Sequence, residues 1–422
     1  MEKIVIRGGH PLSGTVEVSG MKNAAVGVLL STILIDGITV LENLPVISDV
    51  ALSLDILRSM GAVVEQLDAT TYQIDTRHVQ AGSAPPLMVR KMRASYYVIG
   101  AELGRFHTSR VGIPGGCDFG VRPIDQHIKC FEALGADVTM TKDFVIADAT
   151  SGLHGDQIYF DSVSVGATIN GMIAATLADG TTVIENAARE PHVVDVANFL
   201  NTCGARITGA GTDVVKIKGV KRLHGCTYAI IPDMIEAATY MIAAAATNGT
   251  LQITNVIPKH LESVSAKMEE MGVKIEELDD AVIVSPADQL RRVNVKTLPY
   301  PGFPTDAHPQ MSVLLCLAQG VSHVSEGVWD NRFRYVEELR RMGADITVEG
   351  KVATINGGNH FTGAKVRAVD LRAGAAMIIA ALAAQGKTEI DDIYHIKRGY
   401  DNIVGKLQNA GADIQLVDVP DE

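Results

Sequence analysis

The chain has 422 residues, of which 47% are hydrophobic and 20% are charged, and its formal net charge is −12 at pH 7. A chain of this length exceeds what one hydrophobic core usually supports, and its composition is that of a globular protein, so two domains are expected rather than a disordered chain. The negative charge argues against a protein that coats nucleic acid, although it leaves room for a local cationic pocket.

Cysteine content and the lack of long apolar segments predict the compartment. Five cysteines in a chain of this length indicate a reducing environment without a disulfide framework. The N-terminal "MEKIVIRGG" lacks the layout of a signal peptide, and the most apolar run, "MIEAATYMIAAAATNG", is too short to span a bilayer. We therefore expect a cytoplasmic protein that is not bound to a membrane.

Six similar segments recur along the chain at nearly constant spacing. Each combines the end of a helix, a glycine, a small residue and a strand. The glycine is predicted to follow the last helical turn at position C′, where a left-handed backbone suits it. In chain order the segments are "LRSMGAVVE" at Gly61, "FEALGADVT" at Gly135, "LNTCGARIT" at Gly204, "MEEMGVKIE" at Gly272, "LRRMGADIT" at Gly343 and "LQNAGADIQ" at Gly411.

A second pattern alternates with the first. An apolar, alanine-rich helix leads to a glycine and then to a strand such as "TTVIEN", "TLQITN" or "KTEIDD". Each unit of about 70 residues therefore follows the order strand, helix, strand, helix, strand, strand, which predicts an α/β fold made of two groups of three units. The glycines of this second pattern are Gly37, Gly104, Gly180, Gly249, Gly320 and Gly386.

The strands at the two ends of the chain predict how the two groups of three units divide into domains. The last segment, "GADIQLVDVPDE", ends before its partner strand, and the N-terminal "KIVIRGG" and "GTVEVSG" are strands without helices of their own. Because an unpaired edge is a liability, we expect the two ends to pair. One domain is then discontinuous, formed by residues 1–21 and 232–422, and residues 22–231 form the other. The crossovers near Lys22 and Ile231 predict a cleft between the domains, where the active site would lie.

The stretch "GGCDFGVRPID" places Cys117 in a glycine-rich loop between a strand and a helix. Backbone N–H groups and the helix dipole favour anions at such a position, and the same field, together with Arg122, would lower the pKa of the thiol. Pro123 suits the first turn of the helix. The alternative is that Cys117 fills a turn, but the polarity of the loop favours a reactive thiol. Three of the remaining cysteines lie in apolar helical patterns and are expected in the core: Cys130, Cys203 and Cys316. The sequence around Cys226 does not indicate where that thiol lies.

Basic residues mark the starts of several predicted helices. Lys22, followed by Asn23, opens an apolar helix, where its charge opposes the helix dipole. This conflict indicates an anionic ligand, and the alternative is a solvated lysine. Arginines at comparable places in the repeats would direct several guanidinium groups towards phosphate or carboxylate, although each alone would be an ordinary surface residue. They are Arg93, Arg332, Arg372 and Arg398.

Asp306 lies in the proline-rich "PYPGFPTDAHPQ", which leads into an apolar helix. Its position before a helix favours an N-cap, but if it faces the cleft it becomes a candidate general base. His127 follows the cysteine loop and is interpreted as a structural or ligand-orienting residue rather than a catalytic one. The sequence contains no metal-ligand spacing, no P-loop and no dinucleotide-binding glycine motif in a suitable context, so neither a metal nor a cofactor is expected.

The motifs together resemble the bacterial UDP-N-acetylglucosamine enolpyruvyl transferases (1-carboxyvinyltransferases) of the EPSP synthase superfamily. The runs that carry the resemblance span almost the whole chain: "GMKNAA", "MRAS", "PGGCDFGVRPID", "SVSVGAT", "ENAAREP", "PTD", "NRF", "LRAGAA" and "RGY". The resemblance implies a two-domain inside-out α/β barrel with six βαβαββ repeats, three in each domain. The repeat pattern leads to the same six units without reference to the family.

The resemblance also implies roles for particular residues. Lys22, Asn23, Arg122 and Arg398 match the phosphoenolpyruvate site, and Lys22 and Arg398 also count as catalytic. Cys117 matches a general acid that can form a covalent adduct, and Asp306 matches the base for the sugar hydroxyl. The nucleotide-sugar site is matched by Arg93, Arg122, Pro123, Ile124, Asp125, Gln126, Ser164, Val165, Gly166, Asp306 and Val328. Ser48 and Ser162 depart from the family, which often has lysine there, and this puts part of the diphosphate electrostatics in doubt.

The implied reaction is an addition–elimination without cofactor or metal. Enolpyruvate is protonated at its methylene carbon, the 3-hydroxyl of UDP-N-acetylglucosamine attacks, and phosphate leaves, which is the first committed step of peptidoglycan synthesis. The domains are expected to close on the nucleotide sugar. The alternatives are enolpyruvyl transfer to shikimate 3-phosphate and a non-catalytic nucleotide-sugar-binding paralogue. No nucleic acid, membrane or obligate protein partner is expected.

Overall fold

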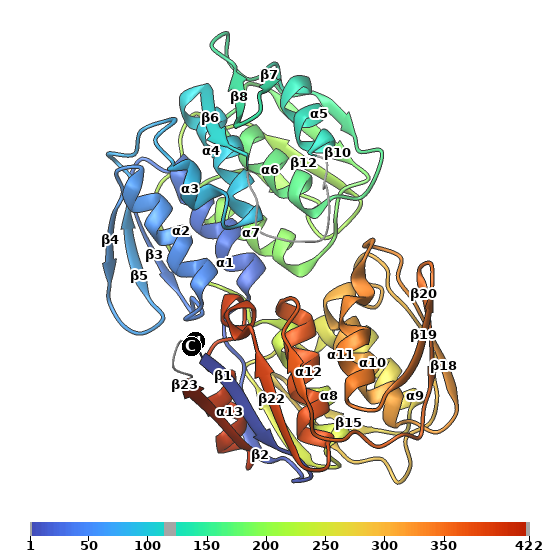
Figure 1. The fold of residues 1–422 in the computed structure, drawn as a ribbon. Coiled ribbons are helices and arrows are strands. Elements are labelled where there is room, and N and C mark those ends of the chain that lie inside the picture. The colour runs from blue at the N-terminus through green and yellow to red at the C-terminus, as the bar shows by residue number, and fades with distance from the viewer. Residues whose placement is uncertain (1, 114–123, 419–422) are drawn as a thin grey trace. The chain divides into compact units, whose positions relative to one another are not determined.

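The computed structural model describes residues 2–113 and 124–418 (Figure 1). Contacts divide the chain into two compact units, one formed by Met1–Ser19 with Pro232–Glu422 and the other by Gly20–Ile231. They are called here the discontinuous unit and the central unit. No helix among the described residues is long and apolar enough to cross a membrane.

The central unit contains three sheets in the described residues, with strand orders β13-β3-β5-β4, β6-β8-β7 and β11-β12-β10-β9. Its elements, in chain order, are α1 (Lys22–Ser31), η1 (Thr32–Leu34), β3 (Ile38–Glu42), α2 (Ser48–Ser59), β4 (Val63–Gln66), β5 (Tyr72–Asp75), α3 (Pro86–Val89), η2 (Arg93–Tyr96), α4 (Tyr97–Phe106), β6 (Thr108–Gly112), α5 (Asp125–Ala133), β7 (Asp137–Met140), β8 (Phe144–Asp148), β9 (Gln157–Tyr159), α6 (Val165–Ala175), β10 (Thr181–Glu185), α7 (Pro191–Thr202), β11 (Ile207–Thr208), β12 (Val214–Lys218) and β13 (Thr227–Ala229).

The discontinuous unit also contains three sheets, with strand orders β15-β16-β14-β2, β17-β18-β20-β19 and β21-β22-β1-β23. Its elements are β1 (Glu2–Arg7), β2 (Ser13–Glu17), α8 (Met234–Ala246), β14 (Thr250–Thr254), η3 (Pro258–Leu261), α9 (Glu262–Glu270), β15 (Lys274–Glu277), β16 (Ala281–Ser285), β17 (Val295–Lys296), η4 (Thr305–Ala307), α10 (His308–Leu317), β18 (Val321–Ser325), η5 (Arg332–Tyr335), α11 (Val336–Arg341), β19 (Asp345–Glu349), β20 (Val352–Asn356), β21 (Lys365–Arg367), α12 (Leu371–Ala383), β22 (Lys387–Asp391), η6 (Ile393–Arg398), α13 (Ile403–Asn409) and β23 (Asp413–Asp418).

The strand pairing shows the predicted βαβαββ repeat. In the run from β9 to β12 the first strand pairs parallel with the second, and the last two pair antiparallel. Other repeats borrow a strand from a distant part of the chain: β13 is the parallel partner of β3, and β2 is the parallel partner of β14. The predicted pairing of the chain ends is confirmed, because β1 and β23 are antiparallel neighbours with Glu2 opposite Asp418.

The first helix of each repeat forms the core. In the discontinuous unit α8, α10 and α12 pack against one another, and in the central unit α4 packs against both α1 and α6. These helices carry alanine, glycine and branched apolar residues around most of their circumference, as buried helices require. In α12, every residue from Arg372 to Leu382 is buried. Within each unit the sheets therefore lie on the outside of the helices (Figure 1).

The second helix of each repeat ends as predicted at a C′ glycine. All six of these glycines have positive φ angles, between +91° at Gly411 and +105° at Gly61. At the end of α7 the Gly204 N–H donates to the Asn201 carbonyl at 3.0 Å, and the Ala205 N–H donates to the Leu200 carbonyl at 2.9 Å. This pair of bonds is the Schellman motif, which satisfies the last carbonyls of the helix and turns the chain into the next strand.

The helix that was predicted to end at Gly104 ends two residues later. The helix α4 continues to Phe106, and His107, with φ of 58°, adopts the left-handed conformation at its end. Gly104 is instead a close-packing position inside the helix, because a Cβ there would lie 2.7 Å from a methyl group of Leu34. The need for a small residue at this contact explains the glycine.

Alanine substitutions at two of the C′ glycines separate the cost of a left-handed backbone from the cost of a steric clash. A Cβ on Gly411 would meet nothing within 4 Å, whereas one on Gly61 would lie 2.5 Å from the His78 carbonyl oxygen. We expect Gly411→Ala to lower the free energy of unfolding by about 1 kcal/mol, the cost of a left-handed alanine, and Gly61→Ala to lower it clearly more. Denaturant unfolding of both variants measures the difference. Equal losses would contradict this steric account of Gly61.

Candidate active site

Asp306 lies in η4, the short turn immediately before α10. Its carboxylate contacts two guanidinium groups: Arg332 Nη2 lies 3.2 Å from Oδ1, and Arg372 Nε and Nη2 each lie 3.2 Å from Oδ2. The arginine side chains are 3% and 4% exposed, whereas that of Asp306 is 29% exposed. Two buried cations therefore lie behind one carboxylate that solvent can reach.

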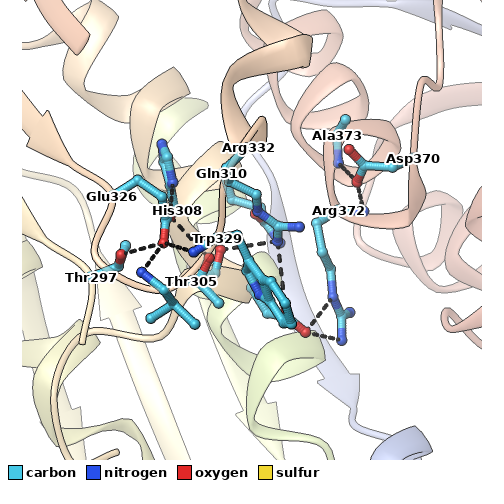
Figure 2. A network of polar contacts seen from close by, with 12 residues as sticks. Thr297, Thr305, His308, Gln310, Glu326, Trp329, Arg332, Asp370, Arg372 and Ala373 are labelled. Atoms are coloured by element: carbon cyan, nitrogen blue, oxygen red, sulfur yellow. Dashed lines mark hydrogen bonds and ion pairs between the residues drawn. The ribbon is translucent and has the colours of Figure 1, made fainter. Parts of the chain in front are cut away.

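The structure corrects the interpretation of Asp306 as an N-cap. The helix α10 begins at His308, and Ala307 occupies its N-cap position without a side-chain hydrogen bond. A true cap is found at α12, where Asp370 Oδ1 accepts the N–H groups of Arg372 at 2.8 Å and Ala373 at 2.9 Å (Figure 2). This cap fixes the first turn of α12, from which Arg372 reaches Asp306.

Glu326 holds several loop segments together through hydrogen bonds, among them those to Thr297, Thr305 and Trp329 that Figure 2 shows. Its Oε1 accepts the hydroxyl of Thr297 at 2.7 Å and the N–H groups of Val328 and Trp329 at 2.7 and 3.0 Å. Its Oε2 accepts the hydroxyl of Thr305 at 3.0 Å and His308 Nδ1 at 2.8 Å. One buried carboxylate thus ties the turn that carries Asp306 to the loop that leads to Arg332.

A chain of hydrogen bonds continues from Glu326 into the core. Since His308 Nδ1 donates to the carboxylate, Nε2 accepts from the Tyr335 hydroxyl at 2.8 Å, and that hydroxyl lies 2.7 Å from Ser312 Oγ. Burial lowers the pKa of His308, so the imidazole stays neutral. Burial opposes the charge of Glu326, but the His308 contact and the other donors outweigh it and lower the pKa of the carboxyl to about 2.

Glu326 was not predicted from the sequence, although the repeat contains a signal for it. The residue directly after the second strand of a repeat is Asn43, Asn186 or Asn255 in three copies, and each has a positive φ. Each of these side chains donates to a backbone carbonyl beyond the neighbouring first strand, at 2.7 to 2.8 Å. Glu326 follows β18 at the same position, so an acid replaces a structural amide. Comparing the copies would have drawn attention to it, together with Asp392, which follows β22 at the same position and has a φ of 59°.

Two other predicted site residues lie in the discontinuous unit. Val328 follows β18 and is 36% exposed, and its N–H is held by Glu326. Arg398 is the last residue of η6 and is partly exposed. The structure thus connects Val328 to the Asp306 network through Glu326, and it places Arg398 on a separate element.

Lys22 is the first residue of α1, as predicted, but it is not solvated. Its ammonium group lies 2.7 Å from Asp49 Oδ2, and the two side chains are only 14% and 4% exposed. Asp49 lies in the first turn of α2, where the helix dipole favours its charge. The lysine is thus held by a partner that sequence analysis did not name. Asn23 follows it in α1 and is half-buried.

Six of the residues predicted for the nucleotide sugar lie around the starts of α5 and α6: Ile124, Asp125, Gln126, Ser164, Val165 and Gly166. Gln126 is buried, and its Oε1 accepts the Asp161 N–H at 2.9 Å while its Nε2 donates to Asp125 at 3.0 Å and to Asp161 at 3.3 Å. Ile124 is the N-cap residue of α5 and is buried. These contacts fix the turn at Asp161, which leads into the cap of α6.

The start of α6 closely approaches a buried histidine. Ser164 is the N-cap and its Oγ accepts the Ala167 N–H at 3.2 Å; Val165 and Gly166 form the first turn. A Cβ on Gly166 would lie 2.9 Å from His127 Nε2. Burial, and then the charge of Arg93, lower the pKa of His127 to about 3, which keeps the ring neutral. The neutral, buried ring of His127 lies beside Gly166 and close enough to Arg93 to be affected by its charge.

The predicted acid and part of its loop are not among the described residues: Cys117, Arg122 and Pro123. Of the other thiols, Cys130, Cys203 and Cys316 are buried as expected. Burial raises the pKa of Cys130 and of Cys316 to about 12, so both stay protonated at neutral pH. Within residues 2–113 and 124–418, no group of three or more His, Cys, Asp or Glu side chains could hold a metal ion.

Comparison with known proteins agrees with this architecture. Residues 6–407 match the EPSP synthase (3-phosphoshikimate 1-carboxyvinyltransferase) family. The enolpyruvyl transferase NikO from Streptomyces tendae superposes with a TM-score of 0.90 at 27% identity, covering 99% of both chains. An EPSP synthase from Acinetobacter baumannii gives 0.77 at 18% identity over 99% of this chain and 100% of its own. The enolpyruvyl transferase fold predicted from the sequence is therefore confirmed.

Curated relatives show to which enolpyruvyl transferases this chain is similar in sequence. UDP-N-acetylglucosamine 1-carboxyvinyltransferase 2 of Clostridium acetobutylicum is 56% identical over 416 residues, which cover 98% of this chain and 99% of the relative. The protein of the same name from Geobacillus kaustophilus is 51% identical over 422 residues, covering 100% of this chain and 98% of the relative. The chain therefore belongs to the UDP-N-acetylglucosamine 1-carboxyvinyltransferases, within the EPSP synthase family.

Glu326→Gln tests the carboxylate that organises the Asp306 turn. A glutamine would point its NH₂ group at hydrogen-bond donors, and the low pKa of Glu326 means that its charge stabilises the fold. The pKa of Glu326 is lowered from the ordinary value of 4.5 to about 2, and this shift corresponds to about 3 kcal/mol of folding stability at neutral pH. A group whose pKa is lowered by folding stabilises the protein fully when the pH is above its pKa in the unfolded state. This stabilisation is lost as the pH falls through its pKa in the folded state. The variant should therefore lose about 3 kcal/mol at pH 7, and this loss should shrink below pH 4 and nearly vanish only as the pH approaches about 2.

Denaturant unfolding at several pH values measures this difference. The matched control is Glu337→Gln, since Glu337 is 70% exposed in a surface pair with Arg340 and should contribute little at any pH. A loss at Glu326 that does not change between pH 7 and pH 3 would show that shape, not charge, is what the site requires.

Proposed function

We propose that the protein transfers the enolpyruvyl group of phosphoenolpyruvate to the 3-hydroxyl of UDP-N-acetylglucosamine and releases phosphate. The observation that carries this proposal is identity above 50% with relatives named for that transfer, over 98% of the chain or more. The Asp306 cluster and the ion-paired Lys22 supply the carboxylate and the cations that the reaction needs. The reaction belongs to cell-wall peptidoglycan synthesis in the cytoplasm.

Asp306 is proposed as the base, and its two arginines suggest how it is activated. Without an anionic ligand, the carboxylate neutralises Arg332 and Arg372. The carboxylate and phosphate of phosphoenolpyruvate are strong partners for guanidinium groups and compete for them. When they take over, Asp306 loses its two cationic partners and accepts the proton of the 3-hydroxyl more readily.

Lys22, Asn23, Arg122 and Arg398 are proposed to hold phosphoenolpyruvate. Fixed cations stabilise the charge of the departing phosphate without reorganising at the moment of reaction. Lys22 would exchange Asp49 for the substrate in the same way that the arginines exchange Asp306. Cys117 is proposed to protonate the methylene carbon, after which carbon 2 is electrophilic enough for the hydroxyl to add and phosphate to leave.

The nucleotide sugar is proposed to bind at the starts of α5 and α6 and at the loop after β18. The proposed contacts are Arg93, Arg122, Pro123, Ile124, Asp125, Gln126, Ser164, Val165, Gly166, Asp306 and Val328. Backbone N–H groups at the start of α6 suit a diphosphate. Because the proposed residues come from both units, we propose that the active site forms in a cleft between two domains, 22–231 and 1–21 with 232–422, that close on the substrate.

An acceptor test separates the possible functions. Purified protein should release phosphate from phosphoenolpyruvate when given UDP-N-acetylglucosamine, and not when given shikimate 3-phosphate. Asp306→Asn should lower kcat at least about 100-fold, since a general base contributes that much or more. Asp55→Asn, at an exposed carboxylate paired with Arg58, is the matched control and should keep full activity.

The other outcomes identify the alternatives. Release only with shikimate 3-phosphate would assign the other acceptor of this fold. Binding of UDP-N-acetylglucosamine without release under any condition would indicate a non-catalytic paralogue. An Asp306→Asn variant with parental kcat would remove Asp306 as the base while leaving the overall reaction in place.

The reactivity of Cys117 provides a second test. An epoxide of the fosfomycin type should alkylate Cys117, which the sequence places beside bound anions. Cys130 and Cys316 should be spared, because burial raises their pKa to about 12 and keeps them as thiols. Peptide mapping by mass spectrometry locates the label, and Cys117→Ser should abolish it. Label on Cys130 or Cys316 with Cys117 untouched would contradict the assignment of the reactive thiol.

A further inference from the structure

Two cysteines outside the proposed chemistry face each other in the central unit. Cys203 is the C-cap residue of α7, and Cys226 directly precedes β13. Their sulfur atoms lie 3.3 Å apart, and both residues are free thiols. The backbone joins the two segments again close by, because the His224 N–H donates to the Cys203 carbonyl at 2.9 Å. The segments that carry the two cysteines are thus held together by a backbone hydrogen bond as well as by the contact between the sulfur atoms.

The two thiols differ in their access to solvent. Cys203 is 0% exposed, whereas Cys226 is only partly buried. The Cys203 S–H can donate to a thiolate on Cys226, which lowers the pKa of Cys226 and raises that of Cys203. A reagent from solvent therefore meets Cys226 first, as the more acidic sulfur, with a protected thiol directly behind it.

We propose that Cys203 and Cys226 are a reversible dithiol–disulfide pair that is oxidised by hydrogen peroxide. The Cys226 thiolate attacks one peroxide oxygen and breaks the O–O bond, giving a sulfenic acid and hydroxide. The Cys203 sulfur then attacks the Cys226 sulfur, the S–O bond breaks, and water leaves as the S–S bond forms. The thiol proton of Cys203 is carried away with the leaving oxygen. Overall, one dithiol and one peroxide give one disulfide and two waters.

The disulfide would attach the last segment of the central unit to α7 at both ends. Asp195, near the start of α7, already accepts the Tyr228 hydroxyl at 2.6 Å and the Ile231 N–H at 3.4 Å. The segment from Cys226 to Ile231 therefore runs along α7 in the opposite direction, with Cys226 beside the end of the helix. Bonding to Cys203 brings the sulfurs from 3.3 Å to about 2.05 Å and fixes that end too.

Peptide mapping under non-reducing conditions tests this proposal. After treatment of the folded protein with hydrogen peroxide, the digest should contain a cross-linked pair of peptides carrying Cys203 and Cys226, lighter by two hydrogen atoms than the separate peptides. Dithiothreitol should restore both thiols. Cys130→Ser, at a buried thiol outside this pair, is the matched control and should leave the cross-link unchanged.

Two variants distinguish the roles of the sulfurs. In Cys203→Ser the sulfenic acid of Cys226 should persist and be trapped by dimedone, whereas in Cys226→Ser the buried Cys203 should remain a thiol. If Cys203→Ser does not fold, Cys226→Ser at the more exposed position still gives its result. Stable sulfenic acid on Cys226 of the parent protein without the cross-link, or a cross-link from either cysteine to Cys117 instead, would overturn the proposal.

Discussion

The constraint on which the structure depends is the complete burial of the first helix of each repeat. A charged side chain in the middle of a helix enclosed by other helices and sheets would be costly, and the charged candidate residues lie near the helix ends instead. Lys22 is the first residue of α1, Ser164 caps α6, and Asp306 lies in η4, the short turn before α10. Arg93 lies one short turn before α4, and Arg372 lies in the first turn of α12. The candidate site residues are thus collected at equivalent points of different repeats, and the same alanine-rich packing that makes the core decides where chemistry can occur.

Cations at these points need partners whether or not a ligand is bound. Arg332, Arg372 and Lys22 are nearly buried, and an unpaired charge at such positions would be costly. Asp306 and Asp49 supply the opposite charge within the same unit. Such pairs hold the guanidinium and ammonium groups in fixed positions. If these cations bind the substrate as proposed, stability of the ligand-free protein and affinity for anions rest on the same side chains.

Much of the fold could be predicted because its signals are local. A C′ glycine, an alanine-rich helix and a strand with no partner can each be recognised within a few residues, and repetition makes them reliable. The site was less predictable because its partners come from distant segments. From the sequence, Lys22 indicated an anionic ligand or a solvated lysine, and its carboxylate partner Asp49 is known only once α2 is placed beside α1. Asp306 was interpreted as an N-cap, and its contacts to Arg332 and Arg372 come from later elements. Glu326 was overlooked because its five donors belong to three separate stretches of chain.

The position of β1 between β22 and β23 has a consequence for how the protein is made. During synthesis the central unit has all of its residues once Ile231 has been added, and it can fold while translation continues. β1 and β2 are made first, yet their partners β22, β23 and β14 come much later. β1, the first strand of the chain, is thus among the last to find a sheet, and its apolar residues Ile4 and Ile6 must be kept from pairing elsewhere until the ribosome has nearly finished.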